Sequence, residues 1–142
     1  MIKILILALS LNLFAEDIIA TPVSVYDGDT FKVNIDEIPY KIFSKGISIR
    51  VRGIDTPEMH GKCDNERKMA RKAKEIVKKY LSNKRVRLID VKRGKYFRIV
   101  ATVKSVGEKE TLEEVLLREN VAVEYDGGKK TKDWCNEHRK SH

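Results

Sequence analysis

The hydrophobic residues of this chain change their spacing near residue 60, and that change limits the folds open to it. Before this point, Ile47, Ile49 and Val51 alternate with polar residues, which is typical of a strand with one buried face. In segment 64–82, apolar residues recur every three or four positions, and lysines and arginines fill most positions between them. The two patterns together predict an α+β protein.

Further strand and helix patterns lie on both sides of this change. Residues 18–35 have the pattern of two strands joined by a tight turn, and strand patterns return at residues 86–91 and 96–103. Thr111 and Glu114 have the spacing of a helix-capping box. The predicted order is three strands, a helix, two strands and a helix. Because short strands interrupted by a helix can close into a small barrel, we expect a five-stranded OB-fold β-barrel.

The first 15 residues resemble a secretory signal peptide. Lys3 precedes a short apolar run, and the small residue Ala15 stands before two acidic residues. A buried first strand and an uncleaved anchor are the alternatives, although the run is short for a membrane span. We therefore expect residues 16–142 to form one mature domain that is secreted or periplasmic, with no stable membrane insertion after the signal is removed.

The charge balance gives a direction for the function. The chain has 29 Lys and Arg residues against 21 Asp and Glu residues, a net charge of +8. A small exported protein this basic is attracted to polyanions, among which nucleic acid is the commonest. The cations of segment 64–82 fit a solvated helix face, and the same field would also attract nucleic acid nonspecifically.

Three short clusters carry residues suited to phosphodiester chemistry. The first is the turn Asp27-Gly28-Asp29, the second is segment 50–58, and the third is segment 95–98. Each has an ordinary explanation by itself, because Asp-Gly is a common hairpin turn and lone arginines on strands are usually solvated. Hydrolysis of a phosphodiester needs a base and positive charge around the phosphate, and the three clusters together supply both.

The acidic residues of the first two clusters suggest a metal site. Asp29 and Asp55 offer hard oxygen ligands from two chain segments, which suits calcium or magnesium rather than zinc. Arg50 and Arg98 can make bidentate contacts with phosphate oxygens. Glu58 follows Asp55 by three residues, beyond a proline, where it can face the metal.

In this combination and order, the clusters resemble those of the staphylococcal nuclease (thermonuclease) family, over about residues 17–126. The resemblance implies an OB-fold barrel with about three helices and a calcium-dependent nuclease that leaves 3′-phosphate ends. It also implies that Asp29 and Asp55 bind Ca²⁺ and that the backbone carbonyl of Thr56 contributes to the site. Asp27 matches an acid close to the metal but outside its first shell of ligands.

The same resemblance assigns the catalytic roles. Glu58 matches the general base, and Arg50 and Arg98 match the arginines that stabilise the phosphate during transfer. Tyr96 matches a tyrosine near the nucleotide phosphate. Tyr125 lies near the family's nucleotide-pocket tyrosines, where it could stack on a base or serve only in packing.

The chain departs from the family pattern at three positions. Phe97 replaces a glycine that often precedes the second arginine, and Gly94 replaces an acid. On a strand, Phe97 and Arg98 would face opposite sides, so Phe97 is expected in the core. Asn120 replaces a helix-ending glycine and can adopt the same left-handed conformation. These changes affect the rim of the substrate site and remove no catalytic group.

Cys63 and Cys135 are the only cysteines, and three states are open to them. In an exported protein, the default is a disulfide that ties the helix to the tail. His60 and His138 give the two cysteines a symmetric spacing that is compatible with zinc. Free thiols are the third possibility.

The sequence therefore predicts a single-domain, calcium-dependent, sugar-nonspecific nuclease acting on DNA and RNA, with nothing that requires more than a monomer. The main alternative is a noncatalytic OB-fold module that binds nucleic acid. A basic protein that binds anionic surface polymer is a further alternative, but it gives no reason for paired acids beside paired arginines.

Overall fold

The computed structural model describes residues 17–136. The predicted signal peptide and His138 lie outside the described residues. Within the part that is described, no helix is both long enough and apolar enough to cross a membrane.

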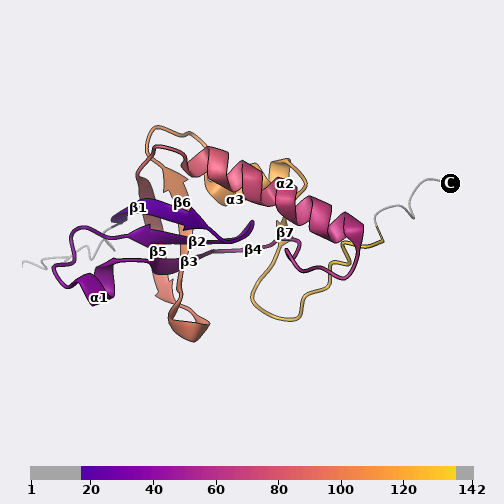
Figure 1. Cartoon of the computed structure of the whole chain (residues 1–142), viewed down its shortest axis with the longest axis horizontal. Coiled ribbons are helices and arrows are strands. Elements are labelled where there is room, and N and C mark those ends of the chain that lie inside the picture. The colour runs from indigo at the N-terminus through magenta and orange to yellow at the C-terminus, as the bar shows by residue number, and fades with distance from the viewer. Residues whose placement is uncertain (1–16, 137–142) are drawn as a thin grey trace, which may run out of the picture.

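Five strands form a closed barrel in the order β1-β2-β3-β6-β5 (Figure 1). They are β1 (Ile18–Val25), β2 (Thr30–Asn34), β3 (Ile47–Val51), β5 (Val86–Arg93) and β6 (Ile99–Ser105). All neighbours are antiparallel except β3 and β6, which run parallel, and β1 pairs with β5 to close the barrel. The predicted α+β OB-fold barrel is confirmed.

The barrel encloses a core of aliphatic residues and one phenylalanine. Phe31, Ile49 and Leu88 are fully buried, and each comes from a strand whose apolar residues alternate with more exposed ones. This alternation is the feature that made the strands recognisable in the sequence.

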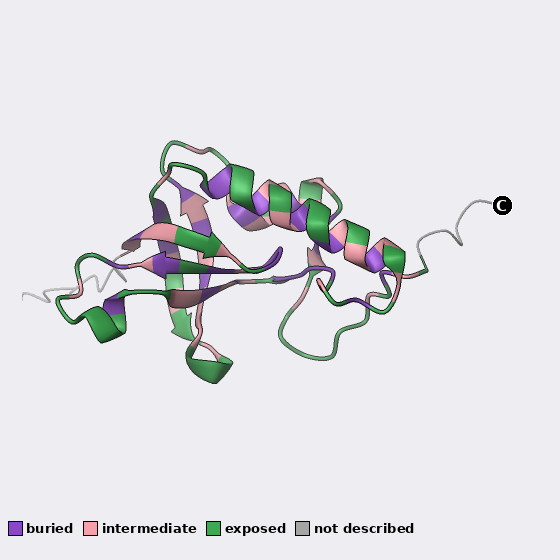
Figure 2. Ribbon diagram, viewed as in Figure 1, coloured by how far each residue is buried: buried purple, intermediate pink, exposed green. Residues whose placement is uncertain are grey.

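The helix predicted over residues 64–82 is α2 (Asp64–Leu81), and it packs along the barrel. Its buried residues form one stripe that includes Ala70, Ala73 and Val77, while lysines and arginines occupy the opposite side (Figure 2). Asn83 follows the helix in the left-handed region, at φ 56°, as expected for a stop.

The second long-range helix, α3 (Leu112–Arg118), lies beside α2. The capping box predicted for it is confirmed: Thr111 Oγ1 accepts from the amide of Glu114, and the Glu114 carboxylate accepts from the amide of Thr111. Asn120 adopts a left-handed φ of 56° after the helix, in the conformation expected there. A single-turn helix, α1 (Lys41–Ser44), lies in the connection between β2 and β3.

A short ladder outside the barrel organises the functional end of the molecule. Strand β4 (Ile54–Asp55) pairs antiparallel with β7 (Val123–Glu124), so that Asp55 lies opposite Val123. This pairing brings the start of the C-terminal segment next to the end of the second cluster. Segment 125–136 then runs toward the first turn of α2 (Figure 1).

The strand predicted over residues 96–103 begins later than expected, because residues 94–98 form a closed turn. The amide of Gly94 donates to the carbonyl of Arg98 at 2.8 Å, and Lys95–Phe97 form a 3₁₀ turn, η1. Tyr96 and Phe97 both have left-handed φ angles, so the alternation of strand side chains does not apply to them. The expectation that Phe97 lies in the core is wrong: its exposed fraction is 86%.

Candidate active site

The Asp27-Gly28-Asp29 turn is buried, unlike an ordinary hairpin turn. Asp27 and Asp29 are each only 7% exposed, and Asp27 Oδ1 accepts from the amide of Asp29. A Cβ on Gly28 would lie 2.8 Å from Cβ of Ala73 and 2.9 Å from the side chain of Thr56. Glycine is therefore required for this turn to approach α2 and the second cluster closely.

Arg50 joins the two acidic clusters. Its guanidinium forms an ion pair with Asp29 Oδ2, and its Nη2 lies 3.9 Å from Asp55 Oδ1. The same Nη2 donates to the carbonyl of Ile54 at 3.0 Å, which holds the arginine against the end of β3 and the start of β4. Thr56 completes the group, since its hydroxyl and amide donate to Asp29 Oδ2 at 3.0 and 3.3 Å.

We call Asp27, Asp29, Asp55 and Glu58 the carboxylate cluster. Burial raises the pKa of Asp27 to about 6, and the charge of Asp29 raises it further, with a smaller effect from Glu58. These causes show that negative charge is concentrated at this end of the barrel. Such a concentration of carboxylates stabilises a bound cation.

Glu58 stands at the exposed edge of the cluster, on a loop that Glu66 holds in place. The Glu66 carboxylate is buried and accepts from the amide of Lys62 at 2.9 Å and from that of Glu58 at 3.4 Å. A Cβ on Gly61 would lie 2.4 Å from the Glu66 side chain, so the loop closes around this carboxylate only with glycine there. Glu66 therefore positions the loop that presents Glu58.

Lys130 is a member of the site that sequence reasoning missed. Its Nζ donates to Glu58 Oε1 at 2.7 Å and lies 2.7 Å from Asp55 Oδ1. The contact with Asp55 is close but poorly directed, so it is an ion pair rather than an aligned hydrogen bond. Partial burial of Lys130 opposes its charge, but the contacts with Asp55 and Glu58 outweigh it and raise the pKa of the lysine.

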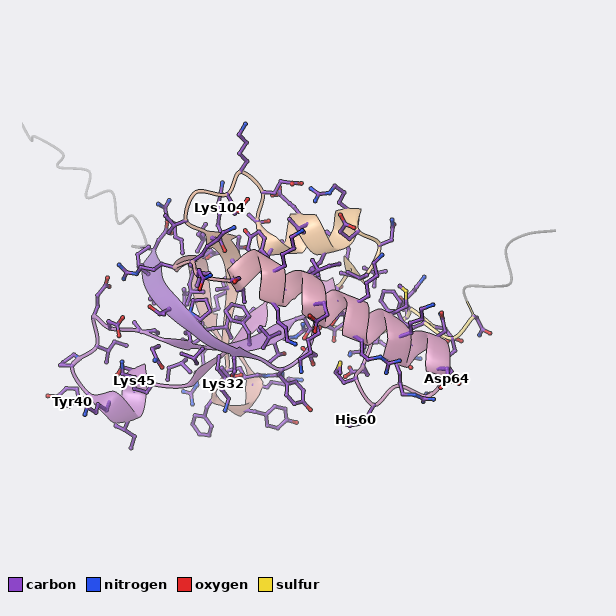
Figure 3. All side chains as sticks on the ribbon, turned by 45° about the horizontal axis from the view of Figure 1, so that its top comes forward. Lys32, Tyr40, Lys45, His60, Asp64 and Lys104 are labelled. Carbon is purple, nitrogen blue, oxygen red and sulfur yellow. A yellow bond between two sulfur atoms is a disulfide. The ribbon has the colours of Figure 1, made fainter. Side chains whose placement is uncertain are left out.

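The segment that carries Lys130 is tied to the first turn of α2. Cys63 and Cys135 form a disulfide, with 5.9 Å between their Cα atoms. Asn65 donates to the carbonyl of Trp134 at 2.8 Å, and the Trp134 side chain is buried. Figure 3 shows His60 and Asp64 on either side of this junction. The disulfide prediction is confirmed, and the bonded sulfurs leave neither thiolate for the zinc alternative.

A cleft of about 530 Å³ adjoins the carboxylate cluster. Arg50, Arg98 and Tyr125 line it, so Arg50 belongs both to the cleft and to the cluster. The Tyr125 hydroxyl donates to the carbonyl of Gly128 at 2.6 Å, which fixes its ring beside the cleft. Tyr96 does not line the cleft: it lies on the adjoining turn and is 84% exposed.

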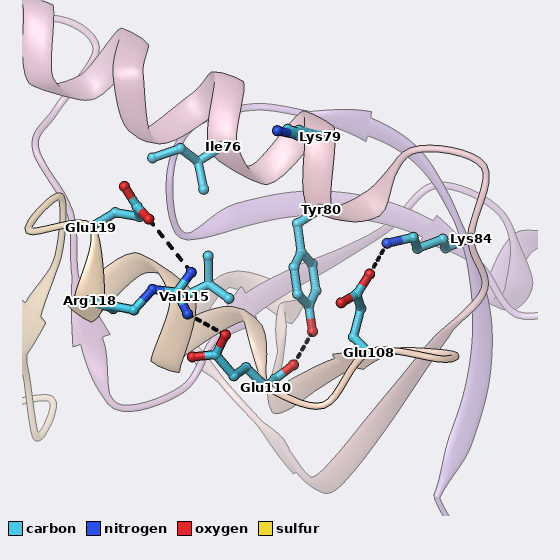
Figure 4. Close-up of a pocket in the computed structure, with 9 residues that line it drawn as sticks. All are labelled: Ile76, Lys79, Tyr80, Lys84, Glu108, Glu110, Val115, Arg118 and Glu119. Carbon is cyan, nitrogen blue, oxygen red and sulfur yellow. Dashed lines mark hydrogen bonds and ion pairs between the residues drawn. The ribbon is translucent and has the colours of Figure 1, made fainter.

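A second cleft, of about 380 Å³, lies between α2 and α3 (Figure 4). Its charged groups are paired with one another, since Lys84 contacts Glu108 and Arg118 contacts Glu110 and Glu119. The Tyr80 hydroxyl donates to the carbonyl of Glu110 at 2.7 Å. These contacts stabilise the junction of the two helices and leave the carboxylate cluster as the candidate site.

The residues of the carboxylate cluster fit a hard divalent cation. Asp55 is 3% exposed, and its Oδ1 has cationic neighbours but no aligned hydrogen bond, which is a costly arrangement for a buried oxygen. Asp29 and Asp55 approach the same guanidinium from two segments. An oxygen-rich site of this kind suits Ca²⁺ or Mg²⁺.

A family model described as staphylococcal nuclease homologue matches residues 48–141. The chain belongs to this family. The matched range includes Arg50, Asp55, Glu58 and Arg98. It begins after the Asp27-Gly28-Asp29 turn, which joins the site through the contacts of Asp29 with Arg50 and Thr56.

A curated relative is also similar to the chain. The protein described as "Probable endonuclease lcl3", from Penicillium rubens, is 31% identical over 97 residues, which cover 56% of this chain and 33% of the relative. The chain thus spans about a third of the length of that relative.

Proposed function

We propose that this domain is a calcium-dependent, sugar-nonspecific nuclease that hydrolyses phosphodiester bonds of DNA and RNA and leaves 3′-phosphate ends. The observation that carries the proposal is the position of Arg50. Its guanidinium contacts Asp29 and approaches Asp55 while it lines the cleft that Arg98 also lines. A cation site and a phosphate site therefore share one residue.

Asp29, Asp55 and Thr56 are the residues that we expect to hold calcium. When bound, calcium supplies positive charge that stabilises the negative charge developing on the phosphate. The two carboxylates are buried and fixed by contacts with Thr56 and Arg50, so their oxygens are already ordered before a cation binds.

In the proposed reaction, Glu58 is the general base. A water oxygen forms a bond to phosphorus, its proton passes to the Glu58 carboxylate, and the bond from phosphorus to the 5′-oxygen breaks. The 5′-oxygen takes up a proton and leaves as a hydroxyl. Arg50 and Arg98 donate to the phosphate oxygens, which carry more negative charge in the transition state than in the substrate.

Lys130 bears on when this base can act. Its ammonium donates to Glu58 Oε1, and a carboxylate that already accepts from a cation is a weaker base. We therefore propose that Lys130 leaves Glu58 before the water is deprotonated. Binding of calcium between the carboxylates would favour that departure, because both cations compete for the same negative charge.

The Cys63–Cys135 disulfide supports the proposal that the protein is secreted or periplasmic, since disulfides persist in oxidising compartments. The proposed mature chain begins at Glu16 and acts as a monomer. N-terminal sequencing of the exported protein and measurement of its mass in solution test these two points.

Cleavage of single-stranded DNA and of RNA by the purified mature protein tests the proposed function. We expect cleavage of both in calcium, none after chelation, and products whose 3′ ends accept no nucleotide until a phosphatase is added. Salt-sensitive binding without cleavage under any divalent cation would instead identify the noncatalytic OB-fold module.

A further inference from the structure

The turn formed by residues 94–98, which we call the rim turn, displays two aromatic side chains to solvent. It connects β5 to β6 and projects from the barrel (Figure 1). Tyr96 is 84% exposed and Phe97 is 86% exposed, and Figure 2 shows the turn as an exposed part of the chain. Neither ring contributes to the core, so packing within the domain does not explain them.

The backbone of the rim turn makes this display costly. Tyr96 has φ 56° and Phe97 has φ 59°, in the left-handed region that residues with a Cβ avoid. The cost is roughly 1–2 kcal/mol for each such residue. Glycine at position 97 would avoid the strain and would also remove an exposed apolar ring. An exposed aromatic residue in a strained conformation suggests a function at the surface.

Arginines flank both rings. The guanidinium carbon of Arg93 lies 5.6 Å from the centroid of the Phe97 ring, and that of Arg98 lies 5.9 Å from the centroid of Tyr96. Within residues 17–136, no carboxylate forms an ion pair with Arg93 or Arg98. The rim turn therefore combines aromatic rings with positive charge that no acid of the described residues neutralises.

The rim turn is continuous with the cleft of the candidate active site. Gly94, Lys95 and Arg98 line that cleft together with Arg50. A nucleic-acid strand with a phosphate between Arg50 and Arg98 has its neighbouring nucleotides beside the turn. Aromatic rings beside a positively charged groove are the elements that bind single-stranded nucleic acid, because unpaired bases stack on the rings and phosphates contact the cations.

We propose that the rim turn is a stacking site for an unpaired base of the substrate strand, next to the phosphate that is cleaved. Phe97 provides the stacking ring, and Arg93 supports that ring and attracts the backbone phosphate. This site deepens the proposed nuclease function and rests on it for the identity of the ligand. It makes single-stranded nucleic acid the preferred substrate, because bases inside a duplex are already stacked on their neighbours.

The test measures binding of a fluorescent single-stranded oligonucleotide of about 12 nucleotides, within the usual site size of an OB fold, to the full mature chain. Chelator is present, so that binding is measured without cleavage. Phe97→Ala should weaken binding roughly five- to thirtyfold, while Phe97→Trp should retain it. Tyr40→Ala is the matched control, because Tyr40 is also an exposed aromatic residue, 69% exposed, but lies beside α1. It should leave the affinity unchanged.

Phe97→Gly separates a binding role from a structural one. Glycine relieves the left-handed φ, so this variant should melt at a higher temperature than the wild type while it binds the oligonucleotide as weakly as Phe97→Ala. A variant that loses stability but keeps its affinity would overturn the proposal, since Phe97 would then be a structural residue.

Two further outcomes keep this proposal distinct from others. Exposed rings among cations can also contact an anionic membrane, so vesicles rich in phosphatidylglycerol are titrated in parallel. Vesicle binding that depends on Phe97, with unchanged oligonucleotide affinity, would overturn the proposal. Absence of cleavage in calcium with oligonucleotide binding that still depends on Phe97 would remove the proposed catalysis and retain the stacking site. Normal cleavage with unchanged affinity in Phe97→Ala would remove only the stacking site.

Discussion

The carboxylate cluster and the rim turn lie on either side of Arg50, and they treat charge in opposite ways. In the cluster, Asp29 and Asp55 are buried and each faces a cationic side chain. In the rim turn, Arg98 and two aromatic rings are presented to the cleft or to solvent, and no acid of residues 17–136 pairs with that arginine. A charge that is paired within the protein favours order, whereas one left unpaired is available to a ligand.

This contrast assigns different work to the two regions. The cluster is suited to hold a cation and a base in fixed positions, which is what the chemical step requires. The rim turn is suited to attract and position a polyanion, which affects binding. Substitutions in the cluster should therefore act mainly on kcat or on metal affinity, and those in the rim turn mainly on KM.

The largest effect is expected at Glu58. Glu58→Gln keeps the shape of the side chain but cannot accept the proton, so kcat should fall roughly 10²–10⁴-fold. The control is Glu37→Gln, which changes an exposed carboxylate between β2 and β3. Single-turnover cleavage of a labelled oligonucleotide measures both variants, and a normal rate for Glu58→Gln would remove it from the mechanism.

Asp27 gives a pH-dependent test of the cluster. Its pKa in the folded protein is about 6, against 3.8 without the fold, so the native state binds the proton more tightly. Stability from this protonation is present at low pH and is lost as the pH rises through 6. Asp27→Asn should therefore stabilise the calcium-free protein by about 2 kcal/mol at neutral pH, and by little below pH 4.

Urea unfolding in chelator at the two pH values measures this difference. The hydrogen bond from the amide of Asp29 can be kept by an asparagine, so the comparison isolates the charge. An equal change in stability at both pH values would show that the charge of Asp27 is not the cause.

Arg98 tests how strongly the rim turn enters the chemical step. Arg98→Lys keeps the charge but loses the bidentate geometry, and kcat should fall roughly 10–10²-fold. Arg87→Lys makes the same substitution on the exposed side of β5, where Arg87 faces Asp17. An effect confined to KM would mean that Arg98 binds the substrate equally in the ground and transition states.

The smallest effect is expected at Lys130. Lys130→Gln removes a cation that competes with calcium for Asp55 and Glu58, so calcium affinity should rise roughly three- to tenfold. Lys129→Gln makes the same change of charge at the neighbouring residue and measures the long-range contribution alone. Calorimetric titration compares the two variants, and equal affinities would show that Lys130 does not guard the site.

Much of the fold could be predicted from local patterns. The strand around Ile49 and the stripe of Ala73 and Val77 on α2 follow from periodicity, and the box at Thr111 follows from spacing. The rim turn could not be predicted in this way. Its two left-handed residues interrupt the alternation just before β6, and nothing in the identity of Phe97 indicates a positive φ.

The candidate site was partly predictable for a related reason. Family motifs identified Asp29, Arg50 and Asp55, and the fold brings these three together. Lys130 was missed because it is 72 residues from Glu58 along the chain, and only the docked C-terminal segment brings the two together. Glu66 was missed because a buried glutamate on a charged helix has the same local pattern as an exposed one.

The account depends most on the claim that the carboxylate cluster is the cation site. Titration of calcium into the wild type and into Asp55→Asn, with Asp36→Asn as an exposed control, tests it directly. The account predicts one calcium site in the wild type and in the control, and an affinity at least roughly tenfold weaker in Asp55→Asn. Equal calcium affinity in all three proteins would contradict it, because the cation would then bind somewhere other than the cluster.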